Sequence, residues 1–288
     1  MHVESLDFRH MELLHDRLKK LHCPIAEYSF PNLYLFRHAH KYEVIFDKEI
    51  FIKGLSYDGY AYLMPTVEIG NMESGYMKAM MNTVDFLFPI PETWLECFSH
   101  DDYQCTCKQG DMDYIYTVEQ MSTYKGRNLH SKRNLLKQFI STYDHKALPL
   151  TNDRLNDALS VLNGWLDDTG QDVAETDYFP CLEALRRYDD LVLCGGIYYA
   201  ENEPAGFIVG EELNEETFAL HFAKARKKFK GVYQYMFNNF AGILPPKYRF
   251  LNFEQDLDKD TLRLAKSSYL PHSMLKKARI ALKRYPGS

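Results

Sequence analysis

Long apolar runs are missing from this chain of 288 residues. No segment approaches the roughly 18 to 20 consecutive apolar residues that a membrane-spanning helix needs. The N-terminal stretch Met1-His-Val-Glu-Ser also lacks the charged and apolar pattern of a secretion signal. We therefore expect a cytoplasmic protein without an integral membrane segment.

Cysteine is sparse, and the motifs of several enzyme classes are missing. The six cysteines are scattered, and only Cys105 and Cys107 stand close together, without a second pair to complete a zinc site. Reduced, mostly structural thiols are the expected state. The sequence has no nucleophile elbow, P-loop, dinucleotide fingerprint or histidine-rich metal motif, which argues against hydrolases, kinases, dehydrogenases and metalloenzymes.

An excess of positive charge is also missing, because 34 lysines and arginines stand against 40 acidic residues. The resulting net charge of -6 argues against a protein that coats nucleic acid or binds DNA, so any contact with a polyanion must be local. What is present is a globular composition, with 45% hydrophobic and 26% charged residues. The length favours two domains of roughly 140 residues each.

The first part of the chain has a helical pattern followed by short apolar runs. Ser5 to Leu21 carries apolar residues at three- and four-residue intervals, which predicts an amphipathic helix. The runs after it are separated by polar or glycine-containing turns and predict strands of an antiparallel meander. These runs are Leu33–Phe36, Tyr42–Phe46, Glu49–Leu55 and Tyr60–Met64.

A strand, a basic loop and a helix follow one another in the second half, at Phe218–Ala223, Lys224–Gly231 and Val232–Phe240. Such a loop brings cations, several unpaired backbone N–H groups and the positive end of a helix dipole together, which predicts a site for a phosphate or another anion. The candidate donor-binding residues here are Lys224, Arg226, Lys227, Lys228, Gly231 and Val232. The alternative is a solvated surface loop.

The same succession occurs about a hundred residues earlier, at Tyr114–Ile140. Its candidate phosphate-binding residues are Lys125, Gly126, Arg127, His130, Lys132, Arg133 and Asn134. The alternative is that Lys132, Arg133 and Lys137 form the solvated face of a helix. The recurrence predicts two halves of similar structure, an N-terminal domain over 1–147 and a C-terminal domain over 148–288, joined near Tyr143–Thr151.

The end of the chain is basic. From Met274 to Tyr285, apolar residues gather on one side of a helical projection and lysines and arginines largely elsewhere. This pattern predicts a closing basic helix.

Several sequence blocks resemble a known family. They are Glu27-Tyr28-Ser29-Phe30-x-Asn32-Leu33-Tyr34-Leu35-Phe36-Arg37, Gly126-Arg127-x-x-His130-x-Lys132-Arg133-Asn134, His221-x-x-Lys224-Ala225, Asn252-x-Glu254-x-Asp256-Leu257 and Leu262-Arg263-x-Ala265-Lys266-x-Ser268-Tyr269-x-Pro271. In this order they resemble the C-terminal domain of lysyl-phosphatidylglycerol synthases. The chain departs from that family's pattern at Ala223, where an acidic residue is common, and at Asp258, where a glycine is common.

The resemblance implies an α/β fold of two tandem GNAT-like acyltransferase domains, each a mixed, mostly antiparallel sheet flanked by helices. It also implies an acyl- or aminoacyltransferase related to the Fem aminoacyl transferases. The donor would be acyl-CoA or aminoacyl-tRNA, with no tightly bound cofactor and no metal. The acceptor would be a small molecule, a peptide or a lipid carrying an amine or hydroxyl.

Proton transfer in such a reaction needs a titratable side chain, and the candidate catalytic residues are Glu254, Asp256, Tyr269 and His221. Glu254 and Asp256 alternate at the end of a predicted strand, which favours one common direction for both side chains. The alternative is an acidic turn that caps the next helix or pairs with Arg263. His221 is equally compatible with a hydrogen-bonded core histidine.

A second functional class also fits the sequence. A non-catalytic protein with the same fold would bind tRNA, a nucleotide or a protein partner without turnover. The consumption of a donor in the presence of an acceptor distinguishes the two.

Overall fold

Two compact units make up residues 1–283, the part of the chain that the computed structural model describes. The first comprises Met1–Asp113, Gln255–Arg263 and residues from Met274 onward, and the second comprises Tyr114–Glu254 and Leu264–Ser273. The units divide between Asp113 and Tyr114, which differs from the expected division into 1–147 and 148–288. The reason is that the segment after Asp113 contributes strands and helices to the second unit.

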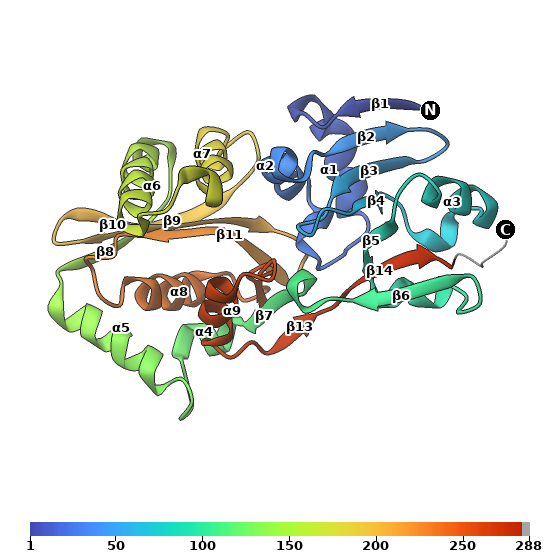
Figure 1. Ribbon diagram of the computed structural model, residues 1–288. Helices are drawn as coiled ribbons and strands as arrows, with labels where there is room; N and C mark the ends of the chain where they lie inside the picture. The colour runs from blue at the N-terminus through green and yellow to red at the C-terminus, as the bar shows by residue number, and fades with distance from the viewer. Residues whose placement is uncertain (284–288) are drawn as a thin grey trace. The chain divides into compact units, whose positions relative to one another are not determined.

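The first sheet has seven strands in the order β1-β2-β3-β4-β5-β14-β6 (Figure 1). Its strands are β1 (His2–Ser5), β2 (Glu43–Phe46), β3 (Ile50–Leu55), β4 (Ala61–Pro65), β5 (Phe86–Pro91), β14 (Lys277–Leu282) and β6 (Tyr103–Cys107). Its unit also holds helices α1 (Met11–Lys19), α2 (Phe30–His40) and α3 (Ser74–Met81). The predicted meander is confirmed for β2, β3 and β4, which pair antiparallel.

The second sheet has seven strands in the order β13-β7-β12-β11-β10-β9-β8. They are β13 (Ser273–Leu275), β7 (Asp113–Thr117), β12 (Phe250–Asn252), β11 (Thr217–Ala225), β10 (Glu203–Glu212), β9 (Cys194–Ala200) and β8 (His145–Pro149). The helices of this unit are α4 (Val118–Thr123), α5 (His130–Thr142), α6 (Leu155–Thr169), α7 (Tyr178–Arg186) and α8 (Val232–Ile243). Helix α9 (Asp260–Ser267) begins in the first unit and ends in the second. Figure 1 shows α6 and α7 on one face of this sheet and α8 on the other.

Both sheets follow one plan. In each, three antiparallel pairings lead to a fourth strand that pairs in parallel with a fifth, β4 with β5 and β11 with β12. In each, the sixth strand comes from elsewhere in the chain, because β14 joins the first sheet and β7 joins the second. The expected pair of similar, mostly antiparallel domains is therefore confirmed.

The predicted repeat, however, pairs the wrong segments. Tyr114–Ile140 and Phe218–Phe240 both belong to the second unit. In the first sheet the counterpart of β11–α8–β12 is β4–α3–β5, and the loop between β4 and α3, residues 66–73, contains two glutamates and no lysine or arginine. Only the second unit has a basic loop at this place in the plan.

Two other predictions from local pattern are wrong. Leu33–Phe36 lies inside α2, because the Ser29 hydroxyl accepts the Asn32 amide and Pro31 occupies the first turn, which starts a helix. Met274 to Leu282 forms β13 and β14 rather than a basic helix. Arg284 and Tyr285 of that predicted helix lie outside the described residues.

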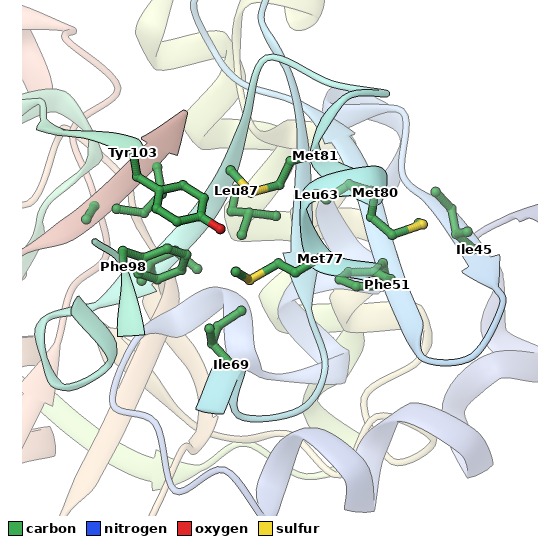
Figure 2. Packing of buried hydrophobic residues seen from close by; sticks show 13 residues of the cluster. Ile45, Phe51, Leu63, Ile69, Met77, Met80, Met81, Leu87, Phe98 and Tyr103 are labelled. Carbon is green, nitrogen blue, oxygen red and sulfur yellow. The ribbon is translucent and has the colours of Figure 1, made fainter. Parts of the chain in front are cut away.

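The apolar core of the first unit gathers around α3. Figure 2 shows Met77, Met80 and Met81 of this helix among side chains of neighbouring strands such as Phe51 and Leu87, all buried. Flexible methionine side chains fill irregular gaps between branched and aromatic neighbours. None of the helices within residues 1–283 combines the length and the apolar character that crossing a bilayer requires.

Candidate functional site

A cavity of about 390 Å³ lies where β11 runs into α8. Its walls come from the end of α6, the loop after β11 and the first turn of α8. The lining residues are Trp165, Asp168, Thr169, Ala225, Arg226, Lys227, Phe229, Lys230, Gly231, Val232, Tyr233 and Gln234. The predicted strand, basic loop and helix are therefore present, and they border an open space.

Gly231 separates the loop from α8, and Val232 begins the helix as predicted. The φ angle of Gly231 is +89°, in the left-handed region that glycine adopts freely. A Cβ atom here would lie 2.3 Å from the carbonyl oxygen of Leu135 in α5. Glycine is required because the loop turns in close contact with a neighbouring helix backbone.

The lysines at this loop differ in whether they pair with an acidic side chain. Lys224 is buried on β11, where its Nζ contacts both oxygens of Asp177 at 2.6 and 2.7 Å and lies 3.8 Å from the centre of the Trp165 ring. Lys228 pairs with Glu203 at the surface. By contrast, Lys227 and Lys230 are exposed and line the cavity.

Five backbone amides of the loop and the start of α8 already have acceptors within the protein. The acceptors are the Ala205 carbonyl for Arg226 (2.8 Å), Asp168 Oδ2 for Lys227 (2.9 Å), the Arg226 carbonyl for Phe229 (3.2 Å), the Tyr143 hydroxyl for Lys230 (3.3 Å) and the Phe229 carbonyl for Val232 (3.2 Å). The expectation of several unpaired amides is wrong at these positions. At these five positions no amide is left for a ligand.

Asp168, at the end of α6, is an acidic partner of this loop. Its Oδ2 accepts from Arg226 Nε at 3.1 Å and from the Lys227 amide at 2.9 Å. The hydrogen bonds from Arg226 and from this amide lower the pKa of Asp168 below its ordinary value. A carboxylate of the protein thus neutralises part of the positive charge of the loop.

The second basic loop, residues 124–129 between α4 and α5, borders a cavity of about 410 Å³. Its lining residues are Thr117, Glu119, Gln120, Thr123, Lys125, Gly126, Arg127, Asn128, Leu129 and Leu270. Lys125, Gly126 and Arg127 are exposed, as a phosphate-binding loop requires. These three predicted residues therefore share one pocket.

The other candidates of this loop have structural partners. Arg133 Nη1 donates to the carbonyls of Tyr124 (2.5 Å) and Gly126 (3.0 Å) and so holds the loop in shape. Lys132 Nζ donates to Ser268 Oγ at 2.6 Å, and burial lowers the pKa of Lys132. The interpretation of Lys132 and Arg133 as a solvated helix face is therefore wrong.

His130 and Asn134 lie one turn apart on the exposed surface of α5. The Asn134 amide nitrogen is 3.3 Å from the His130 ring nitrogen Nδ1. Both remain open to solvent near the second basic loop, and Lys137 is exposed one turn further along α5.

His221 is the extra residue of a β-bulge in β11. Val209 pairs with Phe222 and Gly210 pairs with Leu220, so His221 has no partner of its own on β10. Its imidazole is fully buried between two carboxylates, with Nε2 2.9 Å from Glu211 and Nδ1 2.7 Å from Glu254. The sequence offered His221 as a candidate for proton transfer or as a hydrogen-bonded core histidine, and both of its ring nitrogens are engaged.

We predict that His221 stays protonated well above neutral pH. Burial alone would lower its pKa, but hydrogen bonds to Glu211 and Glu254 outweigh burial and raise it to about 10. The folded protein then retains a proton that the unfolded chain loses near pH 6.5, so this stabilising contribution is complete below about pH 6.5 and is lost as pH rises through the folded-state value. Nitrogen NMR of the imidazole at pH 8 measures this directly, with exposed His38 as an internal reference. A neutral His221 ring at that pH would contradict the prediction.

Glu254 is the second residue after β12 and is fixed from several directions. Its φ is +59°, unusual for a residue with a side chain, and its amide donates to Asn252 Oδ1 at 2.7 Å. Its carbonyl accepts from the Tyr114 amide and from Lys266 Nζ, both at 3.2 Å. The strained backbone and the His221 contact together hold a partly buried carboxylate in one orientation.

Asp256 has a different environment and belongs to the first unit. It is fully buried and accepts two hydrogen bonds from Arg263, at 2.9 and 3.0 Å, as in the acidic-turn alternative. Asp258 follows with φ at +56°, the conformation that the glycine common at this position in the family would adopt easily. Tyr57 and Arg263 both donate to Asp258, which offsets the conformational cost of the aspartate.

Tyr269 lies in an aromatic cluster beside the first turn of α8. Its ring contacts Phe237 and Tyr124, with centroid distances of 5.4 and 6.0 Å, and Lys132 Nζ lies 3.9 Å from its ring centre. Its hydroxyl accepts from Gln234 Nε2 at 2.8 Å. Burial raises the pKa of Tyr269 well above its ordinary value, so the phenol stays protonated at neutral pH.

Sequence reasoning missed the acidic partners in this unit. Asp168, Asp177 and Glu211 pair with residues 10 to 59 positions away in the chain, and no motif marks them. The one local signal near them is Gly164, an isolated glycine within the apolar pattern of α6. Within the described residues no three histidine, cysteine or acidic side chains are grouped as ligands for a metal ion.

Comparison with known families gives one extended match. The model of the phosphatidylglycerol lysyltransferase C-terminal domain matches residues 19–280. Among curated proteins, an uncharacterized protein of Mycoplasmoides gallisepticum is 26% identical over 176 residues, which are 59% of this chain and 56% of that protein. The chain thus spans little more than half the length of that relative.

Solved structures extend the similarity to the whole fold. A conserved protein of unknown function from Bacteroides thetaiotaomicron is 25% identical, with a TM-score of 0.83 over 98% of this chain and 99% of that one. The C-terminal domain of a protein described as a lysylphosphatidylglycerol synthetase, from Agrobacterium fabrum, is 12% identical, with a TM-score of 0.64 over 96% of this chain and 92% of that one. The second likeness concerns the fold alone.

Proposed function

The chain belongs to the family of the phosphatidylglycerol lysyltransferase C-terminal domain, and from this premise we propose that it transfers an aminoacyl group from aminoacyl-tRNA to an amine or hydroxyl acceptor. The family name describes the transfer of a lysyl group. The family's resemblance to the Fem transferases supports tRNA as the carrier of that group. The acceptor is a small molecule, a peptide or a lipid.

We choose tRNA as the donor because of the hydrogen bonds and the exposed lysines in the loop after β11. A pyrophosphate such as that of CoA is well held by free backbone amides at a helix N-terminus. Here four amides of the loop and the amide of Val232, the first residue of α8, have internal acceptors, and Asp168 places a carboxylate beside Lys227. The exposed side chains of Lys227 and Lys230 instead suit the separated phosphates of an RNA backbone, which long cationic side chains reach from outside.

The second basic loop extends the same proposal. Lys125 and Arg127 are exposed at its pocket, and Arg133 keeps the loop in place through two carbonyl contacts. Both basic loops belong to the second unit. We assign them to contacts with tRNA phosphates, which position the donor but carry no amino-acid specificity.

Glu254 and Tyr269 are proposed to move the protons of the transfer. The acceptor nitrogen or oxygen loses a proton to Glu254 and bonds to the carbonyl carbon of the aminoacyl ester. The bond between that carbon and the ribose oxygen of tRNA breaks, and the leaving oxygen takes a proton from the Tyr269 hydroxyl. In this proposal His221 orients Glu254 by its 2.7 Å contact, and the role of Asp256 is structural, because its carboxylate accepts from Arg263 and from the Asp258 amide.

A donor-competition assay tests the proposal. Total tRNA charged with labelled amino acids is incubated with the protein and with phosphatidylglycerol vesicles or a panel of small amines and alcohols, and parallel reactions contain labelled acetyl-CoA. We expect label to leave tRNA only when protein and one acceptor are both present. Consumption of acetyl-CoA instead would assign a CoA donor. Binding of tRNA without any consumption would favour the non-catalytic binding protein.

Charge reversal in the loop after β11 tests the contact of this loop with tRNA. Replacing Lys227 and Lys230 by glutamate removes about two phosphate contacts, so the slope of log affinity against log salt should become less steep by about 1.4 to 1.8. The affinity for tRNA should fall at low salt. Filter binding of total tRNA over a range of salt concentrations measures both quantities.

A matched control reverses two exposed lysines elsewhere, Lys19 and Lys20, which lie at the end of α1 in the first unit. This variant has the same change in net charge, and its salt dependence should match that of the unmodified protein. Equal slopes for the two double variants would remove the loop after β11 from the tRNA-binding surface.

A further inference from the structure

Gly164 stands in the interior of α6, at a buried position in a helix of 15 residues. Glycine destabilises a helix interior relative to alanine, because it loses more backbone freedom on folding. A glycine at such a place usually marks a close approach by another group. The group that lies closest to Gly164 therefore indicates why a glycine is needed there.

The group that approaches Gly164 is the guanidinium of Arg226. A Cβ atom on Gly164 would lie 2.3 Å from both Cζ and Nη1 of Arg226 and 2.5 Å from its Nε. These are the three nearest atoms, and all belong to the end of one flexible side chain rather than to the sheet or to another helix. The missing side chain of Gly164 therefore makes room for the end of the Arg226 side chain.

Asp168 fixes the same guanidinium one helical turn further on. Positions 164 and 168 lie on one face of α6, since residues four apart are neighbours on a helix. Asp168 Oδ2 accepts from Arg226 Nε at 3.1 Å. Within residues 1–283, Arg226 Nη1 and Nη2 have no hydrogen-bond acceptor, and the side chain is 29% exposed where it lines the cavity.

We infer that Gly164 and Asp168 are positioning residues that seat the Arg226 guanidinium flat against α6, with its two terminal amino groups left to bind one phosphate group. The planar fork of arginine matches two phosphate oxygens, and holding it in place before binding reduces the entropy that is lost on binding. That this phosphate is part of tRNA rests on the proposed function. The arrangement in which Gly164 and Asp168 hold the Arg226 guanidinium, called the arginine seat below, does not depend on that function.

Replacement of Gly164 by alanine separates this role from a structural one. The added methyl group displaces a side-chain end and removes a helix-interior glycine, so the melting temperature should stay the same or rise by up to about 2 °C. Phosphate binding should nevertheless weaken by about tenfold, because the arginine loses its seat. A packing role for Gly164 predicts the reverse, with lower stability and unchanged binding.

The measurement is an NMR titration of the Arg226 Nε–H signal with inorganic phosphate, together with filter binding of total tRNA. In the unmodified protein we expect the signal to shift with saturation, and in Gly164→Ala to shift weakly. Arg226→Ala should bind tRNA as weakly as Gly164→Ala, and the double variant should be no weaker than either, because both changes remove one interaction. Additive losses in the double variant would overturn the inference.

Two variants of Asp168 give a further check. Asp168→Asn keeps an oxygen that accepts from Arg226 Nε but removes a negative charge near the phosphate, so phosphate affinity should be preserved or higher. Asp168→Ala removes the acceptor and should weaken phosphate binding. Equal affinity in both variants would also overturn the inference.

The outcomes keep the inference apart from the proposed function. An Arg226 signal that responds to phosphate and depends on Gly164, in a protein that does not bind tRNA, would support the seat and refute the tRNA donor. An Arg226 signal that phosphate does not shift would refute the seat, whatever the affinity for tRNA.

Discussion

Replacement of Glu254 by glutamine is expected to lower the turnover of aminoacyl transfer by about 10²- to 10⁴-fold, the usual contribution of a general base. The glutamine side-chain oxygen can still accept the hydrogen bond that His221 donates at 2.7 Å. The side chain therefore keeps its orientation, but it no longer takes a proton from the acceptor. The affinity for tRNA and the melting temperature should change little.

The measurement is the rate at which labelled amino acid leaves tRNA in the presence of the acceptor that the donor assay identifies. Glu211→Gln is the matched control, since Glu211 contacts the other ring nitrogen of His221 at 2.9 Å and has no proposed contact with substrate. Only Glu254→Gln should lose activity strongly. If both variants lost it equally, the charge of the buried trio would be the cause. A destabilised but fully active Glu254→Gln would end its assignment as a base.

Replacement of Lys277 by methionine should lower the free energy of unfolding at neutral pH by about 3 to 5 kcal/mol, the cost of leaving buried charges without their partner. Lys277 is fully buried on β14. Its Nζ lies 2.8 and 2.6 Å from the oxygens of Glu27, 2.6 Å from Asp113 and 2.8 Å from the Gln255 side chain. Methionine keeps the volume but leaves two carboxylates close together without a cation.

The pH dependence of this variant has a definite sign. Burial raises the pKa of Glu27, the attraction of Lys277 opposes this, and nearby Asp113 raises it again. Without Lys277 the folded-state pKa rises further above the unfolded value of about 4.3, so the folded variant binds more protons than the unfolded chain. Its stability is therefore highest below that unfolded value and decreases as pH rises.

Urea denaturation at pH 5.5 and pH 8 measures this, and Lys277→Met should be relatively more stable at the lower pH. The control is Lys276→Met, because the neighbouring lysine is exposed and pairs with Glu92 at the surface. That variant should resemble the unmodified protein at both values. If Lys277→Met costs no more than this control, the buried cluster does not stabilise the fold.

The sequence determined those features that local periodicity and turn residues encode. The strand of β11, the glycine before α8 and the start of this helix at Val232 follow from an apolar run, a basic stretch and one glycine. The resemblance across the chain identified two mostly antiparallel domains. The strand, the glycine and the helix start are predictable because each depends on residues that are close together in the chain.

Only the tertiary structure decided the course of the C-terminal segment and the partners in the site. Lys277 and Arg279 suggested a solvated basic helix, since lysine and arginine are rarely buried without partners. They lie on β14, an inner strand of the first sheet, because Glu27 and Asp111, 250 and 168 positions away, supply buried carboxylates. His221 with Glu254 and Arg226 with Gly164 likewise meet across 33 and 62 positions, and no local pattern encodes such contacts. Their physical cause is the packing of sheet and helices, which brings together side chains whose spacing in the sequence carries no signal.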